Sequence, residues 1–182
     1  LKKHKILICN HKNNSFYSKY IYELSKKLLD QKSIKEINIV GNIKENINEE
    51  KLKKLLNTKN ISLFGKLDNK LLLEIIEKNT IVIHLNYGDP CPNFISEVIS
   101  YGLPCILNDI GGGKEIAQKA CLCPKNKIYL EGYHMPKIND VIQSLNKLIS
   151  NYKSHQIYAI KRAHQLNIKN YVKLHLNTIN KI

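Results

Sequence analysis

The chain of 182 residues is 43% hydrophobic, which suits one folded domain of ordinary size with a sizeable core. No apolar run approaches the ~20 residues of a membrane-spanning helix, and no signal peptide is evident, because charged residues at the N-terminus lead directly into an expected strand. The net charge of +14 favours anionic partners: nucleotides, anionic lipid headgroups or nucleic acid.

The positive charge comes almost entirely from lysine, since Arg162 is the only arginine among 29 basic residues. Asparagine and isoleucine are abundant as well, so a compositional bias explains the charge better than a functional basic face does. Scarce arginine also argues against nucleic-acid recognition, where bidentate arginine contacts to bases are usual. The five cysteines, an odd number without a secretion signal, predict a reducing cytoplasm.

Short apolar runs alternate along the chain with segments of helical periodicity. Strands are expected at residues 5–9, 36–41, 60–65, 80–86, 104–108 and 120–124. Helices are expected at residues 19–29, 49–56, 69–78, 94–101, 113–116 and 138–152. This alternation is typical of an α/β fold with a Rossmann-like parallel sheet and helices on both faces. Residues 125–137 are expected to form a loop, and Asp68 is expected to cap a helix rather than to act as a catalytic acid.

The stretch from Tyr87 to Gly113 runs from the end of one expected strand through a loop, a helix and a second strand to a glycine turn. Asn93 is expected to cap the N-terminus of this helix. In open α/β sheets, ligands bind outside the carboxyl ends of the strands, and helix N-termini there attract anions. Asp89 in the loop and Glu97 on the helix would then line one cleft. A sugar nucleotide offers matching groups, namely phosphates for the helix ends and hydroxyls for the carboxylates.

Motifs in this stretch resemble the donor-binding signature of GT-B glycosyltransferases, most closely the retaining, family 4-type enzymes known as glycosyl transferases group 1. Asp89 and Glu97 stand eight positions apart and are followed by Tyr101-Gly-Leu-Pro104 and then by Asp109-Ile-Gly-Gly112. These motifs keep the family's order and register, except that Asp89 stands where Glu is usual. The resemblance covers roughly residues 5–150 and corresponds to the C-terminal, donor-binding half of a two-domain enzyme.

The resemblance implies transfer of a sugar from a nucleotide-sugar donor, a UDP- or GDP-sugar being expected, without a separate cofactor or a metal ion. Glu97 would accept hydrogen bonds from the ribose, and Asp89 would contact hydroxyls of the transferred sugar, so these are the expected catalytic residues. The expected donor-binding residues are His11, Lys12, Lys19, Gly65, Lys66, Leu67, Asn93, Phe94, Gly111, Gly112 and Gly113.

Each group of donor-binding residues has an expected task. The first three follow the first strand, where family members carry a basic residue that reaches the diphosphate, although solvated surface lysines explain them equally well. The loop at 65–67 would pass the nucleotide base. Asn93 and Phe94 would donate backbone amides, and the glycines at 111–113 would let the backbone approach the ligand.

The resemblance also sets expectations for the whole protein. Residues 1–152 would form the donor-binding domain, and residues 153–182 would form helices that pack toward an N-terminal acceptor domain missing from this chain. A chain that starts at Leu1 fits a fragment of a longer enzyme, inactive alone. Its acceptor would be a glycan or a lipid-linked glycan of the cell surface. The enzyme would act in the cytoplasm or at the inner face of the membrane, in contact with anionic lipid and without a nucleic-acid partner.

Three alternatives stay open at this stage. A non-catalytic nucleotide-sugar-binding module would keep the fold and the affinity without transfer. A binder of anionic polymers would act through charge alone, and its affinity would fall steeply with salt. A sugar-nucleotide epimerase of the GT-B fold is the third, disfavoured because those enzymes resemble a different motif set.

Overall fold

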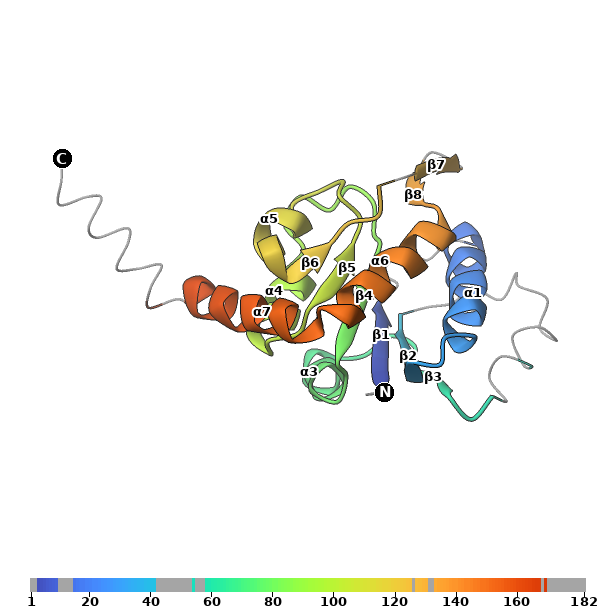
Figure 1. Cartoon of the computed structure of the whole chain (residues 1–182), viewed down its shortest axis with the longest axis horizontal. Helices are drawn as coiled ribbons and strands as arrows, with labels where there is room; N and C mark the ends of the chain where they lie inside the picture. The colour runs from blue at the N-terminus through green and yellow to red at the C-terminus, as the bar shows by residue number, and fades with distance from the viewer. Residues whose placement is uncertain are drawn as a thin grey trace.

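A six-stranded parallel sheet forms the centre of the computed structural model, in the strand order β3-β2-β1-β4-β5-β6 (Figure 1). The structure describes residues 3–9, 15–41, 54, 58–125, 127–130, 133–167 and 169. The strands of this sheet are β1 His4–Cys9, β2 Ile34–Val40, β3 Ile61–Leu63, β4 Ile81–His84, β5 Cys105–Leu107 and β6 Cys121–Leu122. The predicted α/β class with a Rossmann-like parallel sheet is confirmed.

The strands are apolar on both faces because both faces are covered. Successive side chains of a strand point to opposite faces, so Ile6 and Ile8 of β1 enter one hydrophobic cluster while Leu7 enters the other. All three are fully buried. In the parallel register Ile8 lies between Ile39 of β2 and Ile83 of β4. Near-continuous apolar strands of this kind are typical of parallel sheets covered by helices.

Helices form a layer on each face of the sheet. They are α1 Ser15–Leu29, α3 Asn69–Glu77, α4 Asn93–Ser100, α5 Gly113–Ala117, α6 Ile138–Ser150 and α7 Tyr152–Leu166, with a 3-10 helix, η1, at Gln118–Ala120. Side chains of α1 and α6 join the cluster on the Ile6 face of the sheet. Those of α3, α4, α5 and α7 join the cluster on the opposite face. The predicted helices on both faces are therefore confirmed.

Several predicted boundaries are wrong. Helix α1 begins at Ser15, four residues before the predicted start, and the helix predicted over 138–152 ends at Ser150 as α6, so that α7 begins already at Tyr152. Strand β6 ends at Leu122, because the next residues leave the sheet before Pro124. The helix predicted over 49–56 lies outside the described residues, apart from residue 54.

The predicted loop at 125–137 is also wrong, because it contains an antiparallel hairpin. Strand β7 Lys127–Leu130 pairs with β8 Tyr133–Pro136 in a separate two-stranded sheet. Met135 anchors this hairpin in the core, where it is fully buried. The hydroxyl of Tyr20 on α1 donates to the carbonyl of Pro136 at 2.7 Å. Tertiary contacts therefore stabilise a hairpin too short to show in the hydrophobic pattern.

Helix α7 crosses α4 and η1 and ties the end of the described chain to the domain (Figure 1). Arg162 fixes it to α5, since its Nε donates to the carbonyl of Ile116 at 2.7 Å and its Nη2 to that of Glu115 at 3.3 Å. Ile157 and Ile160 remain exposed on α7. That residues 153–182 pack toward a separate acceptor domain stays a prediction, as does the boundary at 152.

The predicted cap at Asp68 is confirmed, since its Oδ1 accepts a hydrogen bond from the amide of Leu71 at 2.9 Å. We expect Asp68→Ala to lower the free energy of unfolding by about 1 kcal/mol, because one amide of the first turn of α3 loses its partner. Asp68→Asn keeps the capping oxygen and should lie close to the wild type. Chemical denaturation of the three proteins measures this; equal loss in both variants would assign the effect to charge rather than to capping.

Candidate functional site

Two loops meet at the carboxyl edge of the sheet, one following β4 and one following β5. Asp89 and Gly111 form an isolated parallel bridge between them. The amide of Gly112 donates to the carbonyl of Asp89 at 3.0 Å, and the amide of Gly88 donates to that of Ile110 at 3.3 Å. The neighbouring pair β1 and β4 is where the strand order reverses, the usual ligand-binding crevice of open α/β sheets. The structure therefore joins the predicted site loops beside this crevice.

The contact between the loops explains two of the glycines. A Cβ atom at Gly111, where φ is +115°, would lie 2.4 Å from the carbonyl oxygen of Asp89. One at Gly112 would lie 1.9 Å from the carbonyl oxygen of Pro90. Both positions must therefore lack a side chain for the loops to touch, whether or not a ligand is bound. At Gly113 a Cβ would meet only side chains, at 3.4 Å or more. Close approach of a ligand to these glycines stays a prediction.

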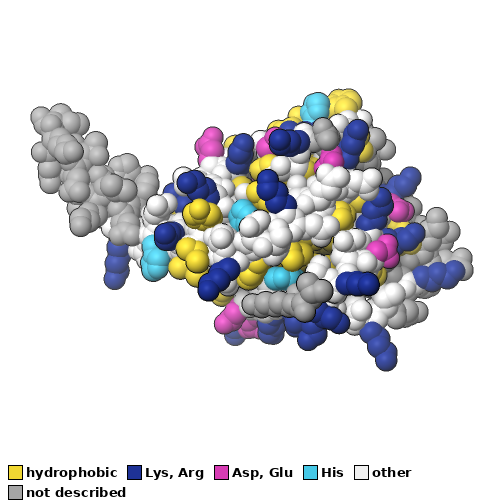
Figure 2. Space-filling view, viewed as in Figure 1, with side chains coloured by type: hydrophobic (Ala, Val, Ile, Leu, Met, Phe, Trp, Pro, Cys, Tyr) yellow, Lys and Arg dark blue, Asp and Glu magenta, His cyan; other side chains and the backbone are white. Residues whose placement is uncertain are grey.

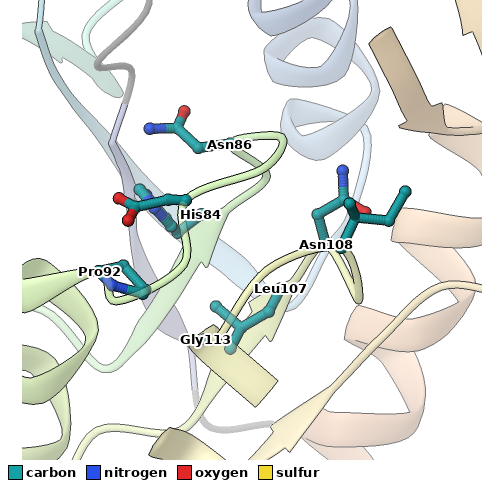
Figure 3. A pocket seen from close by; sticks show the side chains of 8 residues that line it. His84, Asn86, Pro92, Leu107, Asn108 and Gly113 are labelled. Atoms are coloured by element: carbon teal, nitrogen blue, oxygen red, sulfur yellow. The ribbon is translucent and has the colours of Figure 1, made fainter. Parts of the chain in front are cut away.

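A small pocket of about 10 Å³ lies between the two loops (Figure 3). This volume is near the lower limit for one water molecule. Its lining residues come from the ends of β4 and β5, from both loops and from the start of α5: His84, Asn86, Asp89, Pro92, Leu107, Asn108, Ile110 and Gly113. The pocket is therefore a small hollow beside Asp89, lined by polar and apolar residues, rather than a cavity that could enclose a whole ligand.

Three polar residues of the pocket were not in the predicted site, namely His84, Asn86 and Asn108, and each is more than nine-tenths buried. The Nδ2 of Asn108 donates to the carbonyl of His134 at 2.9 Å, whereas its Oδ1 has no partner among the residues that the structure describes. His84 and Asn86 lie at the end of one apolar strand run, and Asn108 lies at the end of the next. A polar residue at that position was the signal that would have identified them.

Asp89 shapes its own loop. Its Oδ1 accepts a hydrogen bond from the amide of Cys91 at 3.2 Å, a local turn that Asp forms readily. The residue is half-buried at the mouth of the pocket. Asp89 therefore has a structural task in addition to any ligand contact, and the contact itself stays a prediction.

The start of α4 differs from the prediction in one respect. Pro92 occupies the N-cap position, in extended backbone with φ −70°, and Asn93 is the first helical residue, so the prediction of Asn93 as N-cap is wrong. Proline fixes φ near this value without needing an amide, which suits it to the residue before a helix. No side chain caps this helix start. Phe94 is buried against His84, with ring centroids 5.2 Å apart, and so anchors the helix.

Glu97 lies on α4 and is half-buried. Burial raises the pKa of its carboxyl group above the ordinary value of 4.5. Its charge is also felt at Cys9, the last residue of β1, where it adds to burial in raising the pKa of the thiol. Glu97 therefore stands near the carboxyl end of β1, at the crevice, where its ionised form costs free energy.

The other predicted donor-binding residues lie in different surroundings. Lys19 is exposed on α1. At the end of β3, Gly65 has φ +61° and its carbonyl accepts from the amide of Gly41 at 2.7 Å, while Lys66 is exposed and Leu67 is half-buried. This loop shares the carboxyl edge of the sheet with Asp89 because the strands are parallel. The predicted residues 11 and 12 lie outside the described residues.

Within the described part of the chain, no group of three or more His, Cys, Asp or Glu side chains is arranged to hold a metal ion. Likewise, none of the helices described is long and apolar enough to cross a membrane.

Comparison with known proteins gives a family and a fold. A family model described as "Glycosyl transferases group 1" matches residues 3–165. No curated protein sequence matches the chain. The family match spans both site loops, α4 and the hairpin, so it covers every described element named above apart from the last residue of α7.

Solved structures share the fold at low sequence identity. The GtfA/B complex is similar with a TM-score of 0.75 at 13% identity, covering 99% of this chain and 36% of that chain. Sucrose-phosphate synthase from Thermosynechococcus elongatus is similar with a TM-score of 0.66 at 13% identity, over 98% and 45%. UDP-GlcNAc 2-epimerase from Neisseria meningitidis, solved bound to UDP-GlcNAc, has a TM-score of 0.60 at 18% identity, over 100% and 45%. This chain therefore spans less than half the length of each of these proteins.

The glycine contact makes a steric prediction. We expect Gly112→Ala to be destabilised by on the order of 1–3 kcal/mol, because the new methyl group must push the backbone at Pro90 away. Gly113→Ala, one residue later at the start of the same helix, should stay close to the wild type, since its methyl group meets side chains at ordinary distances. Urea denaturation measures both; equal stability of the two variants would mean that the loops are not in contact.

Glu97 makes a pH prediction. Folding raises the pKa of the Glu97 carboxyl group, so the folded protein is destabilised as this group ionises. The free energy of unfolding falls as pH rises from the ordinary pKa through the raised one, and the loss is complete above both values. We therefore expect Glu97→Gln to have a higher free energy of unfolding than the wild type at neutral pH, and this difference should shrink toward pH 4. Glu77→Gln, on the exposed side of α3, controls for the loss of a negative charge. A destabilised Glu97→Gln at pH 7 would show instead that the carboxylate stabilises the fold.

Proposed function

The chain belongs to the glycosyl transferases group 1 family, and on this premise we propose that it is the donor-binding domain of an enzyme that transfers a sugar from a nucleotide-sugar to an acceptor. The observation that carries the proposal is the half-buried Glu97 at the crevice beside β1, eight residues after an aspartate on the rim of the neighbouring pocket. A sugar nucleotide has groups for both carboxylates. Its ribose would bind Glu97, and its transferred sugar would bind Asp89.

The cost of keeping Glu97 supports a binding role. Burial disfavours its ionised form, and a residue retained against stability is typical of a functional site. A ribose hydroxyl that donates to the carboxylate would replace the water removed by burial. In this proposal Glu97 is a substrate contact, and the rest of α4 holds it in position through buried side chains such as Val98.

The diphosphate would lie at the start of α4. Without a capping side chain, the first turn of this helix keeps amides for an anion, and the helix dipole favours negative charge there. As the bond to the sugar breaks, negative charge develops on the departing diphosphate, and prearranged amides stabilise it without reorganising. A basic side chain from Lys12 or Lys19, or His11, would complete the contact. The base would pass the loop at 65–67, on the same edge of the sheet.

The finer features of the proposal are a retaining outcome, transfer without a metal ion, and a UDP- or GDP-sugar as donor. We further propose that a separate domain binds a glycan or lipid-linked acceptor, in surface-glycan synthesis on the cytoplasmic side of the membrane. The donor-binding domain alone would then bind the nucleotide-sugar and transfer little or nothing.

A sugar-nucleotide epimerase is the second candidate, favoured by one observation. The meningococcal epimerase solved with UDP-GlcNAc shares the fold over the whole of this chain. The family match favours transfer. The two reactions differ in their substrates, because an epimerase converts UDP-GlcNAc alone, whereas a glycosyltransferase also needs an acceptor. Product analysis by NMR of UDP-GlcNAc incubated with the protein, free of acceptor, separates them. A new epimer would reject transfer as the primary reaction.

Donor binding is tested by thermal denaturation with UDP, GDP, ADP and their sugars. A ligand at ~100 times its Kd should raise the free energy of unfolding by roughly 2.7 kcal/mol. We expect one nucleotide series to stabilise the wild type and Glu77→Ala alike, and to lose this effect in Glu97→Ala, because only the last removes the ribose contact. Stabilisation that survives in Glu97→Ala, or that falls steeply with salt, would instead indicate charge-driven binding.

A further inference from the structure

The β7–β8 hairpin is attached to the site, although nothing in the sequence pattern indicated a hairpin there. The ammonium group of Lys127 forms an ion pair with Asp109, in the loop after β5. The carbonyl of His134 accepts a hydrogen bond from the side-chain amide of Asn108, with 2.9 Å between Nδ2 and the oxygen. Contacts from both strands of the hairpin therefore reach consecutive residues of the loop that carries the glycine turn. At the end of β8, the carbonyl of Pro136 accepts a hydrogen bond from the hydroxyl of Tyr20 on α1.

Three aromatic rings form a row from this hairpin to the site loop, and we call them the aromatic row: Tyr129, His134 and Tyr87. The ring centroids of Tyr129 and His134 are 5.0 Å apart, and those of His134 and Tyr87 are 5.8 Å apart. Tyr129 is 67% exposed, the highest value among the large hydrophobic side chains that the structure describes. In the space-filling view a histidine lies next to hydrophobic side chains at the upper edge, over the hairpin (Figure 2). The row ends two residues before Asp89.

We propose that the aromatic row binds one pyranose ring of the acceptor saccharide, beside the sugar being transferred, while the separate domain binds the rest of the acceptor; this rests on the proposed function. A pyranose presents an apolar face of C–H groups, which packs on aromatic rings, and a rim of hydroxyls, which need polar partners. The site supplies such a partner next to the row. Asn108 is 4% exposed and lines the pocket, and its Oδ1 has no hydrogen bond among the described residues. A buried acceptor of this kind is costly unless a donor such as a hydroxyl reaches it.

The order of the strands favours the acceptor over the nucleotide as occupant. Glu97 lies near the end of β1, because its charge helps to raise the pKa of Cys9 there. Asn108 and Asp109 follow β5, and β4 lies between β1 and β5 in the sheet. Asp89 follows β4, so it separates the proposed ribose contact from the hairpin. A ring on the aromatic row therefore meets the transferred sugar from the side opposite the nucleotide. The ion pair neutralises Lys127, which makes this face a poor match for a phosphate.

Saturation-transfer difference NMR tests the proposal with the methyl pyranosides of glucose, galactose, mannose and N-acetylglucosamine, at about 10 mM because single sugars bind weakly. The expected result is transfer to the ring protons of at least one pyranoside. In Tyr129→Ala the affinity should fall roughly 2- to 10-fold, the worth of one aromatic contact. Tyr158→Ala, which removes an exposed tyrosine of α7, is the matched control and should bind like the wild type.

Two further arms distinguish this proposal from the proposed function. Tyr129→Ala should keep the wild-type melting temperature, because the side chain is exposed, and should keep the stabilisation by nucleotides. Pyranoside signals should persist when the nucleotide is bound. The proposal is overturned if no pyranoside receives saturation, if Tyr129→Ala and Tyr158→Ala behave alike, or if a nucleotide displaces the pyranoside. Loss of nucleotide binding with intact pyranoside binding would instead count against the donor site alone.

Discussion

The backbone contact between the loops after β4 and β5 is the constraint on which the site depends. Strands β4 and β5 pair in parallel register, with His84 opposite Leu107, so both loops leave the sheet at the same level. They can then touch only because Gly111 and Gly112 have no side chain to strike the backbone of Asp89 and Pro90. The contact determines where the carboxylate of Asp89 lies. Helix α4 begins three residues after Pro90, and α5 begins one residue after Gly112, so both helix starts lie close to the contact.

Around this contact, stability and function require different things. The core clusters on both faces of the sheet are apolar, whereas the carboxyl edge collects the buried polar residues His84, Asn86 and Asn108. The carboxyl of Glu97 is costly to ionise, and the Oδ1 of Asn108 lacks a described partner. Two further contacts stabilise the segments at this edge. Arg162 donates hydrogen bonds to two carbonyls of α5, and Lys127 of the hairpin forms an ion pair with Asp109. In the proposed function, these polar groups form a prearranged binding site, held in place by contacts that do not involve the ligand.

The sheet and most of the helices could be predicted from the sequence because buried parallel strands are nearly continuous apolar runs, as at Ile81–His84. The meeting of the Asp89 loop and the glycine turn at one edge of the sheet could be predicted because each follows an expected strand, whereas the ligand contacts of Asp89 and Glu97 stay predictions. Other features depend on distant partners and leave no local pattern. The hairpin is held by Asp109 and α1, and the partner of Gly112 is a carbonyl more than twenty residues away. Asn93 was predicted as the cap from propensity, but Pro92 takes the position because its φ is already fixed there.

The most direct test of the account is a crystal structure of this chain with the nucleotide-sugar that stabilises it most. A ribose hydroxyl should lie within hydrogen-bond distance of the Glu97 carboxylate, about 2.5–3.0 Å between oxygens, with the sugar beside Asp89. The diphosphate should then meet the first turn of α4. A nucleotide bound on the lysine-rich surface, with Glu97 untouched, would contradict the account and leave a charge-driven anion binder in its place.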